Sequence, residues 1–381
     1  MVPPPLGLYV HLPWCVRKCP YCDFNSHETR GAVPVEAYTD ALLLDLDREL
    51  ARAPGRPVES VFIGGGTPSL FPPEAVARIL DRLGSRLGDA PEITLEANPG
   101  TVDEARFSGF RLAGINRLSI GVQSFQPQLL QRIGRIHDGA EARRAAEAAH
   151  AAGFERINLD LMFGLPGQTV AQAVADARIA MELQVAHVSH YQLTLEPNTV
   201  FYSRPPTLPD DDLAWEMQNS CGTLLHGYGL HRYEISAWAR PGEACRHNLN
   251  YWGYGDYLGI GAGAHGKLTH PNGQVIRYRK VRVPAAYMRP GTATRDAACW
   301  EVPEAERPLE FLMNALRLQQ GFTMSLFESR TGLDGACMRD SLATLEAEGL
   351  LRCEGETIRT SRLGMNHLDS VLQRFLPEAV S

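Results

Sequence analysis

The chain has 381 residues, of which 44% are apolar and 21% are charged, and its formal net charge is −7. This composition is typical of a soluble protein with room for a large domain and a smaller one. The acidic balance argues against a nucleic-acid-binding protein, no apolar run is long enough to cross a bilayer, and the first residues lack the pattern of a secretory signal.

The first 230 residues alternate between strand-like and helix-like segments. Strands are predicted over Leu6–His11, Val58–Ile63, Glu92–Ala97, Leu118–Val122, Arg156–Met162 and His187–Leu195. Helices are predicted over Val35–Arg52, Pro73–Leu87, Ala140–Ala152, Val170–Leu183 and Asp211–His226. Repeated strand–helix units predict an α/β fold with a parallel sheet, either doubly wound or closed into a barrel. Both folds bind their ligands at the carboxyl ends of the strands.

The pattern changes after about residue 230. From His231 to about Val283 the chain is rich in aromatic residues and glycine, and we expect short strands that pack aromatics at the open side of the sheet. We place a domain boundary between residues 289 and 290. Residues 290–381 combine short helices with a short strand over Glu356–Thr360, which resembles a winged-helix domain. Because the chain is acidic, a lid or docking role is favoured over DNA binding by this domain.

Three cysteines lie within eight residues just after the first strand, in Cys15-Val-Arg-Lys-Cys19-Pro-Tyr-Cys22. Three thiolates that converge select zinc or an iron–sulfur cluster. A closed zinc site needs a fourth ligand, and only His27 lies near. A cubane cluster held by three cysteines keeps one iron open to a small ligand. The five other cysteines are scattered, which indicates a reducing compartment, the cytoplasm, rather than a disulfide framework.

The CxxxCxxC spacing resembles the motif of the radical S-adenosylmethionine (SAM) superfamily. The resemblance implies an incomplete (β/α)6 barrel, a [4Fe-4S] cluster on Cys15, Cys19 and Cys22, and SAM bound to the open iron. In that superfamily an electron from the cluster cleaves SAM to methionine and a 5′-deoxyadenosyl radical. The aromatic residue before the third cysteine, here Tyr21, packs near the adenine.

Further motifs match SAM-contacting positions of the same superfamily. Gly64-Gly-Gly-Thr-Pro68 follows the second strand, where glycines let the backbone approach a ligand closely. Glu96 ends the third strand and can accept hydrogen bonds from ribose hydroxyls. Asp160 lies in an apolar strand, where a carboxylate needs a partner, and Arg135 is the expected one. The complete set of expected SAM contacts is Tyr9, Tyr21, Gly65, Gly66, Thr67, Glu96, Gln123, Arg135 and Asp160.

In combination, Tyr9-Val-His-Leu-Pro-Trp-Cys15, GGGTP, SIGVQSF and NLDLMFGLPGQT resemble the oxygen-independent coproporphyrinogen III dehydrogenase-like family, which includes heme chaperones. The dehydrogenases have a fourth cysteine where this chain has Phe24, and a longer segment before the cluster. His247-Asn-Leu-Asn-Tyr-Trp252 matches the HNxxYW motif of the chaperones, which is linked to heme. Imidazole is a common axial ligand of heme iron, so His247 is the candidate, with Cys245 or Tyr251 as alternatives.

The resemblance therefore implies a heme chaperone of porphyrin metabolism that binds the cluster, SAM and heme. Its expected partners are a heme-accepting protein, such as a respiratory heme enzyme, and an electron donor for the cluster. A peripheral contact with a membrane needs no spanning segment. One alternative is the dehydrogenase itself, which decarboxylates the propionates of coproporphyrinogen III to give protoporphyrinogen IX. Another is a zinc-stabilised binding module without iron.

Overall fold

Six parallel strands form the middle of a twelve-stranded sheet in the computed structural model, which describes residues 3–291 and 294–376. They are β1 Leu6–Leu12, β4 Val58–Gly65, β5 Leu87–Ala97, β6 Arg117–Gln123, β7 Arg156–Phe163 and β8 His187–Gln192, and they are neighbours in this order. All five pairings are parallel. The carboxyl ends of these strands therefore lie along one edge of the sheet.

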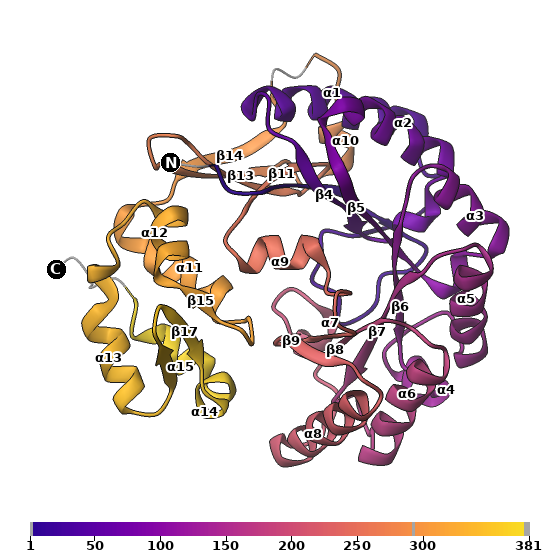
Figure 1. The fold of residues 1–381 in the computed structure, drawn as a ribbon. Coiled ribbons are helices and arrows are strands. Elements are labelled where there is room, and N and C mark those ends of the chain that lie inside the picture. The colour runs from indigo at the N-terminus through magenta and orange to yellow at the C-terminus, as the bar shows by residue number, and fades with distance from the viewer. Residues whose placement is uncertain (1–2, 292–293, 377–381) are drawn as a thin grey trace.

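Helices follow the strands and cover the outer face of the curved sheet (Figure 1). They are α1 Val35–Arg52, α2 Pro73–Leu83, α3 Glu104–Leu112, α5 Gly139–Ala151, α6 Val170–Glu182 and α8 Asp211–Gly227. In α2 the buried residues Val76, Ile79, Leu80 and Leu83 repeat with the helical period and join the core under the sheet. The end strands of the sheet, β14 and β9, are not paired with each other in the described residues, so the predicted incomplete barrel is confirmed.

The sheet is extended at both edges by strands from the second half of the chain. On one side β10 Ala237–Ala239 pairs with β8, and β9 His231–Glu234 pairs with β10. On the other side β11 Asp256–Ile260 runs parallel to β1, and β12 His265–Thr269, β13 Val275–Lys280 and β14 Asp296–Glu301 follow as antiparallel strands. The expected short strands of this region are thus present.

The HNxxYW segment was expected among these strands and is instead the helix α9, Arg246–Trp252. The high aromatic content hides a helical period, because His247 and Tyr251 are four residues apart and lie on the same face. Helix α9 packs against β1, β4 and α11, so it lies between the barrel and the C-terminal helices (Figure 1).

The end of the chain forms a small unit with its own core. Its elements are α11 Arg307–Ala315, β15 Phe322–Thr323, α12 Met324–Thr331, α13 Arg339–Ala347, β16 Leu351–Glu354, β17 Thr357–Thr360, α14 Arg362–Asn366 and α15 Leu368–Gln373. Helices followed by a small antiparallel sheet are the arrangement expected of a winged-helix-like domain. The boundary near residue 290 stays a prediction. No helix in residues 3–291 and 294–376 combines the length and apolar character of a membrane span.

Candidate functional site

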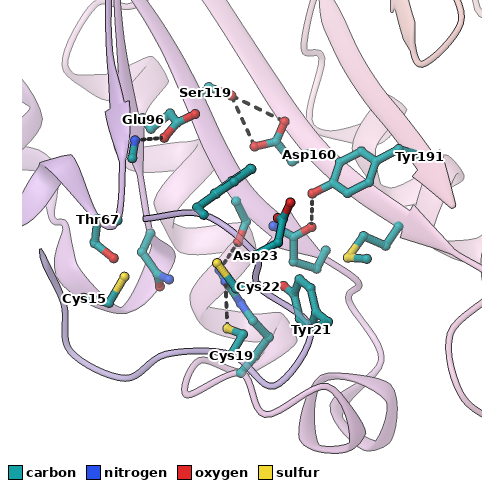
Figure 2. Close-up of a pocket in the computed structure, with 18 of the residues that line it drawn as sticks. Cys15, Cys19, Tyr21, Cys22, Asp23, Thr67, Glu96, Ser119, Asp160 and Tyr191 are labelled. Atoms are coloured by element: carbon teal, nitrogen blue, oxygen red, sulfur yellow. Dashed lines mark hydrogen bonds between the residues drawn. The ribbon is translucent and has the colours of Figure 1, made fainter. Parts of the chain in front are cut away.

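A pocket of about 250 Å³ opens at the carboxyl ends of the parallel strands (Figure 2). Its position is the one expected for a ligand site in a sheet of this kind. The expected cluster and SAM residues that line it are Cys15, Cys19, Tyr21, Cys22, Gly65, Gly66, Thr67, Glu96, Gln123, Arg135 and Asp160.

 The pocket thus gathers eleven of the twelve expected residues, and Tyr9 is the exception.

The three cysteines lie along one side of this pocket, opposite the carboxyl groups of Glu96 and Asp160 (Figure 2). Arg135 Nη1 donates to Cys19 Sγ at 3.7 Å, and Cys22 Sγ lies 3.6 Å from Ser26 Oγ. Burial raises the pKa of the Cys15 thiol to about 11, so this thiol stays protonated near neutral pH until a metal binds.

This donor set fits a cluster with one open iron. Three soft thiols border one pocket, and no fourth cysteine and no histidine is among the described residues that line it. In the described part of the chain no three His, Cys, Asp or Glu side chains lie close enough together to hold a metal ion, so the thiols must draw together when they bind one. A fourth zinc ligand is not offered from the described walls of the pocket.

The glycine loop after β4 is held against the segment that leads to the cysteines. The backbone N–H of Gly66 donates to the carbonyl of Leu12, and that of Thr67 donates to the carbonyl of Trp14. Gly65 has a φ of 122°, and a Cβ on Gly66 would lie 2.5 Å from the Trp14 oxygen. Only glycine fits this close approach, so the loop forms a fixed backbone wall of the pocket.

Two buried carboxyl groups face the pocket from neighbouring strands. Glu96 Oε2 accepts a hydrogen bond from the Gly65 N–H at 3.0 Å, and burial together with the charge of Asp160 raises the pKa of Glu96 to about 8. Asp160 accepts from Asn158 Nδ2 at 2.8 Å and from Ser119 Oγ at 3.2 Å, while burial raises its pKa. A protonated carboxyl can donate as well as accept, which suits a ligand that carries hydroxyl groups.

The expected pairing of Arg135 with Asp160 is wrong as a direct contact. Arg135 donates to the carbonyl of Gly121 and to Cys19, and its charge reaches Asp160 only through space. The sequence could not show this, because Asn158, two residues before Asp160 on the same face of β7, already supplies the short hydrogen bond.

Sequence reasoning missed Tyr191, which lines the pocket from β8. Its hydroxyl donates to Gln123 Oε1 at 2.7 Å. Gln123 has a φ of 68°, which is uncommon for a residue other than glycine, so this hydrogen bond holds a strained position at the end of β6. The rule that ligands lie at the carboxyl ends of parallel strands would have identified Tyr191 if it had been applied to β8.

Tyr9 does not line the pocket but contacts residues that support it. Its hydroxyl lies 2.9 Å from His11 Nδ1, and His11 Nε2 lies 2.9 Å from the carbonyl oxygen of Asn25. Asn25 follows Cys22 closely in the chain, so Tyr9 and His11 support the far end of the cysteine loop. Burial lowers the pKa of His11 to about 4, which keeps its ring neutral and able to accept one hydrogen bond while donating another.

His247 lies outside this pocket, on α9. It is 1% exposed, its Nδ1 lies 2.9 Å from Ser60 Oγ, and its ring stacks on Phe62 with 5.2 Å between the centroids. Its backbone N–H donates to Glu92 Oε1 at 3.1 Å. Nε2 has no hydrogen-bond partner among the described residues, and burial lowers the pKa of the ring to about 3. The ring therefore keeps a lone nitrogen for a ligand, but it is covered in this conformation.

Comparisons with known proteins match nearly the whole chain. The model of the radical SAM superfamily matches residues 9–180, and that of the HemN C-terminal domain matches residues 302–366. Heme chaperone HemW of Escherichia coli is 49% identical over 98% of this chain and 99% of its own length. Heme chaperone HemW of Haemophilus influenzae is 45% identical over the same shares, and that of Bacillus subtilis is 34% identical over 97% and 99%.

Among solved structures, the coproporphyrinogen III oxidase HemN of Escherichia coli superimposes with a TM-score of 0.82. The two chains are 22% identical, and the match covers 98% of this chain and 90% of the other. At this level of identity the likeness shows a shared fold, while the HemW proteins show the family.

Proposed function

Because the chain belongs to the HemW family of the radical SAM superfamily, we propose that it is a heme chaperone, which binds heme and transfers it to a heme-accepting protein. The observation that carries the proposal is the identity of 45–49% to proteins named heme chaperone, over nearly the full length of each chain. We propose the cytoplasm as its location, in keeping with eight cysteines that are all free in the described residues.

Cys15, Cys19 and Cys22 would hold a [4Fe-4S] cluster, and the residues of the same pocket would bind SAM. When both are bound, they supply one-electron reduction of SAM. The backbone of Gly65 and Gly66 gives a ligand close access to the loop after β4. Glu96 offers its carboxyl from β5 as a donor or acceptor for hydroxyl groups.

His247 stays the proposed axial ligand of heme iron. Its unpartnered Nε2 supports this role, because a buried nitrogen without a partner is costly unless a ligand or water meets it. The ring packs between Phe62 and Tyr251, so a macrocycle reaches it only if α9 moves away from β4. Cys245 is a weaker candidate, because its thiol lies 3.3 Å from Glu92 Oε1, and burial raises its pKa to about 12.

The test uses anaerobically reconstituted full-length protein with SAM and a reductant. One arm supplies heme and then a heme-free respiratory enzyme, and the other arm supplies coproporphyrinogen III. We expect stable heme binding, transfer of heme to the recipient, and no protoporphyrinogen. Decarboxylated product without heme transfer would instead establish the dehydrogenase alternative.

A matched pair of variants tests whether the cysteine pocket holds an iron–sulfur cluster or zinc. Cys19→Ala removes a proposed cluster ligand, and Cys337→Ala removes an exposed cysteine of the C-terminal unit. If iron and sulfide are absent from preparations of both wild type and Cys337→Ala, and zinc is found instead, the zinc-stabilised module would be the correct interpretation.

A further inference from the structure

A second cavity, of about 880 Å³, lies at the opposite end of the barrel from the cysteine pocket. Leu6 and Ser60 line it near the beginnings of β1 and β4, whereas the cysteine pocket lies beyond the ends of the same strands. Residues from α9 and from α12 complete its walls, so it lies between the barrel and the C-terminal unit. Its volume is in the range of about 300–1,000 Å³ that is usual for small-molecule sites.

The walls of this cavity are apolar and rigid over a large part. Their apolar members are Pro3, Pro4, Pro5, Leu6, Pro57 and Leu249. Four of these six residues are prolines, whose fixed φ angles hold the wall in shape before any ligand arrives. No aromatic side chain lines the cavity among the described residues, so the stacking platform that a nucleobase uses is not found there.

The charged groups of this cavity are three arginines and one glutamate. Arg56 Nη1 lies 2.8 Å from Asp256, and Arg246 Nη2 lies 3.4 Å from Glu59. Arg330 Nε donates to the carbonyl of Gly253, and no carboxylate in the described residues lies within salt-bridge distance of its guanidinium. Burial lowers the pKa of Arg330, the charge of Asp256 opposes this shift, and the charge of Arg56 adds to it. A ligand anion beside Arg330 would offset the cost of burying its charge.

We propose that this cavity binds a flat, largely apolar tetrapyrrole through its carboxylate groups, with heme as the physiological ligand. Arg330 and Arg246 hold the carboxylates, since a guanidinium matches a carboxylate in a two-point hydrogen bond. The macrocycle lies on the prolines and Leu249. This inference rests on the proposed function and names where the chain first receives its heme.

His247 does not line the cavity, although its hydrogen-bond partner Ser60 does. Arg246, Leu249 and Asn250 of α9 line the cavity, while His247 faces Ser60 and Phe62. No histidine, cysteine, methionine or tyrosine lines the cavity among the described residues, so its walls offer the iron no protein ligand. The cavity therefore recognises the porphyrin and its carboxylates, and metal-free protoporphyrin IX binds there as well as heme does.

The test titrates metal-free protoporphyrin IX into the full-length protein and follows its fluorescence, with heme as a competitor. We expect saturable binding of protoporphyrin IX and its displacement by heme. The dimethyl ester of the porphyrin, which has no free carboxylates, should bind at least about tenfold more weakly. Arg330→Glu should weaken binding of protoporphyrin IX at least as much. Arg374→Glu reverses the charge of an exposed arginine in the same C-terminal unit. It is the matched control and should leave the binding of protoporphyrin IX unchanged.

Arg330→Gln is the milder second variant, and the circular dichroism of each variant shows whether it has folded. Unchanged protoporphyrin binding by both folded Arg330 variants would overturn the cavity assignment, as would equal binding of the dimethyl ester. If wild type binds heme but not protoporphyrin IX, and His247→Ala abolishes heme binding, the inference fails while the proposed function stands. If protoporphyrin IX binds as described but heme never reaches a recipient, the proposed function fails while the cavity assignment stands.

Discussion

The buried polar groups at the two ends of the barrel differ in what they face. At the carboxyl ends of the strands, Glu96 and Asp160 face a pocket, and burial raises the pKa of both. At the other end, Lys267 Nζ lies 3.1 Å from Asp256, and His247 meets Ser60. The carboxyl groups at the first end face a ligand pocket. At the second end, which we call the base, Asp256 and Lys267 satisfy each other and hold β11 and β12 together.

This difference predicts that the carboxyl groups of the pocket respond to a ligand, whereas the Asp256–Lys267 pair resists change. Buried polar groups without full partners raise the energy of the empty pocket, which a ligand can then recover. A buried ion pair whose partners satisfy each other is costly to break from either side. We therefore expect variants at the pocket to lose ligands, and variants of the Asp256–Lys267 pair at the base to lose stability.

The largest expected effect is at the cysteine loop. Cys19→Ala removes one of three thiols from a pocket whose described walls hold no spare cysteine or histidine, so a cluster can no longer be held. We expect iron and sulfide to fall to background in anaerobically reconstituted protein, together with loss of the brown colour.

The control for this variant is Cys337→Ala, which changes an exposed cysteine outside the pocket and should keep the full iron content. Iron and sulfide at wild-type stoichiometry in Cys19→Ala would show that Cys19 is not a ligand.

The next effect is on stability at the base. Asp256 is fully buried, and it accepts from Lys267, from Arg56 and from the Thr269 hydroxyl. Asp256→Asn keeps the shape but leaves the buried ammonium of Lys267 without a counter-charge. We expect the free energy of unfolding to fall by about 3–5 kcal/mol, measured by urea denaturation.

The double variant Asp256→Asn/Lys267→Met removes both charges of the buried pair and should recover part of that loss. A loss of less than about 1 kcal/mol in the single variant would mean that water reaches the pair, and that the base is less well sealed than the contacts indicate.

The sequence predicted the fold and the pocket better than it predicted the base. The strand–helix alternation and the position of GGGTP, Glu96 and Asp160 at strand ends follow from local patterns, and the structure brings these residues to one pocket. The helix α9 was missed because its seven residues have few apolar side chains with a clear period. The long-range pairs were also invisible, since Ser60 and His247 are 187 residues apart in the chain.

The pH dependence of stability should separate the two ends, beginning with Glu96. Its folded pKa of about 8 lies above its usual value of 4.5, so the folded state holds a proton that the unfolded state releases. The stability that this group contributes is present below pH 4.5 and is lost as the pH rises to about 8. Glu96→Gln should flatten this decline, measured as the free energy of unfolding between pH 5 and 8. If the free energy of unfolding of Glu96→Gln depends on pH as steeply as that of wild type, the Glu96 carboxyl is solvated in the folded state.

At the base, His247 should make the free energy of unfolding depend on pH in the opposite direction. Its folded pKa of about 3 lies below the usual 6.5, so the unfolded state binds a proton that the folded state refuses. The stability that it contributes is complete above pH 6.5 and is lost as the pH falls toward 3, by up to about 1.4 kcal/mol per pH unit. His247→Gln should make this decline in stability at low pH, the acid limb, shallower. The free energy of unfolding is measured by urea denaturation between pH 4 and 7.

His190 provides a reference for that variant, because burial lowers its pKa to about 4 and it lies on β8, away from α9. His190→Gln should flatten the same limb without changing heme binding, whereas His247→Gln should change both if His247 ligates the iron. If His247→Gln leaves the acid limb as steep as in wild type, the ring is reachable by protons in the folded state. The base around α9 would then open as readily as the pocket at the other end, and the contrast between the two ends would fail.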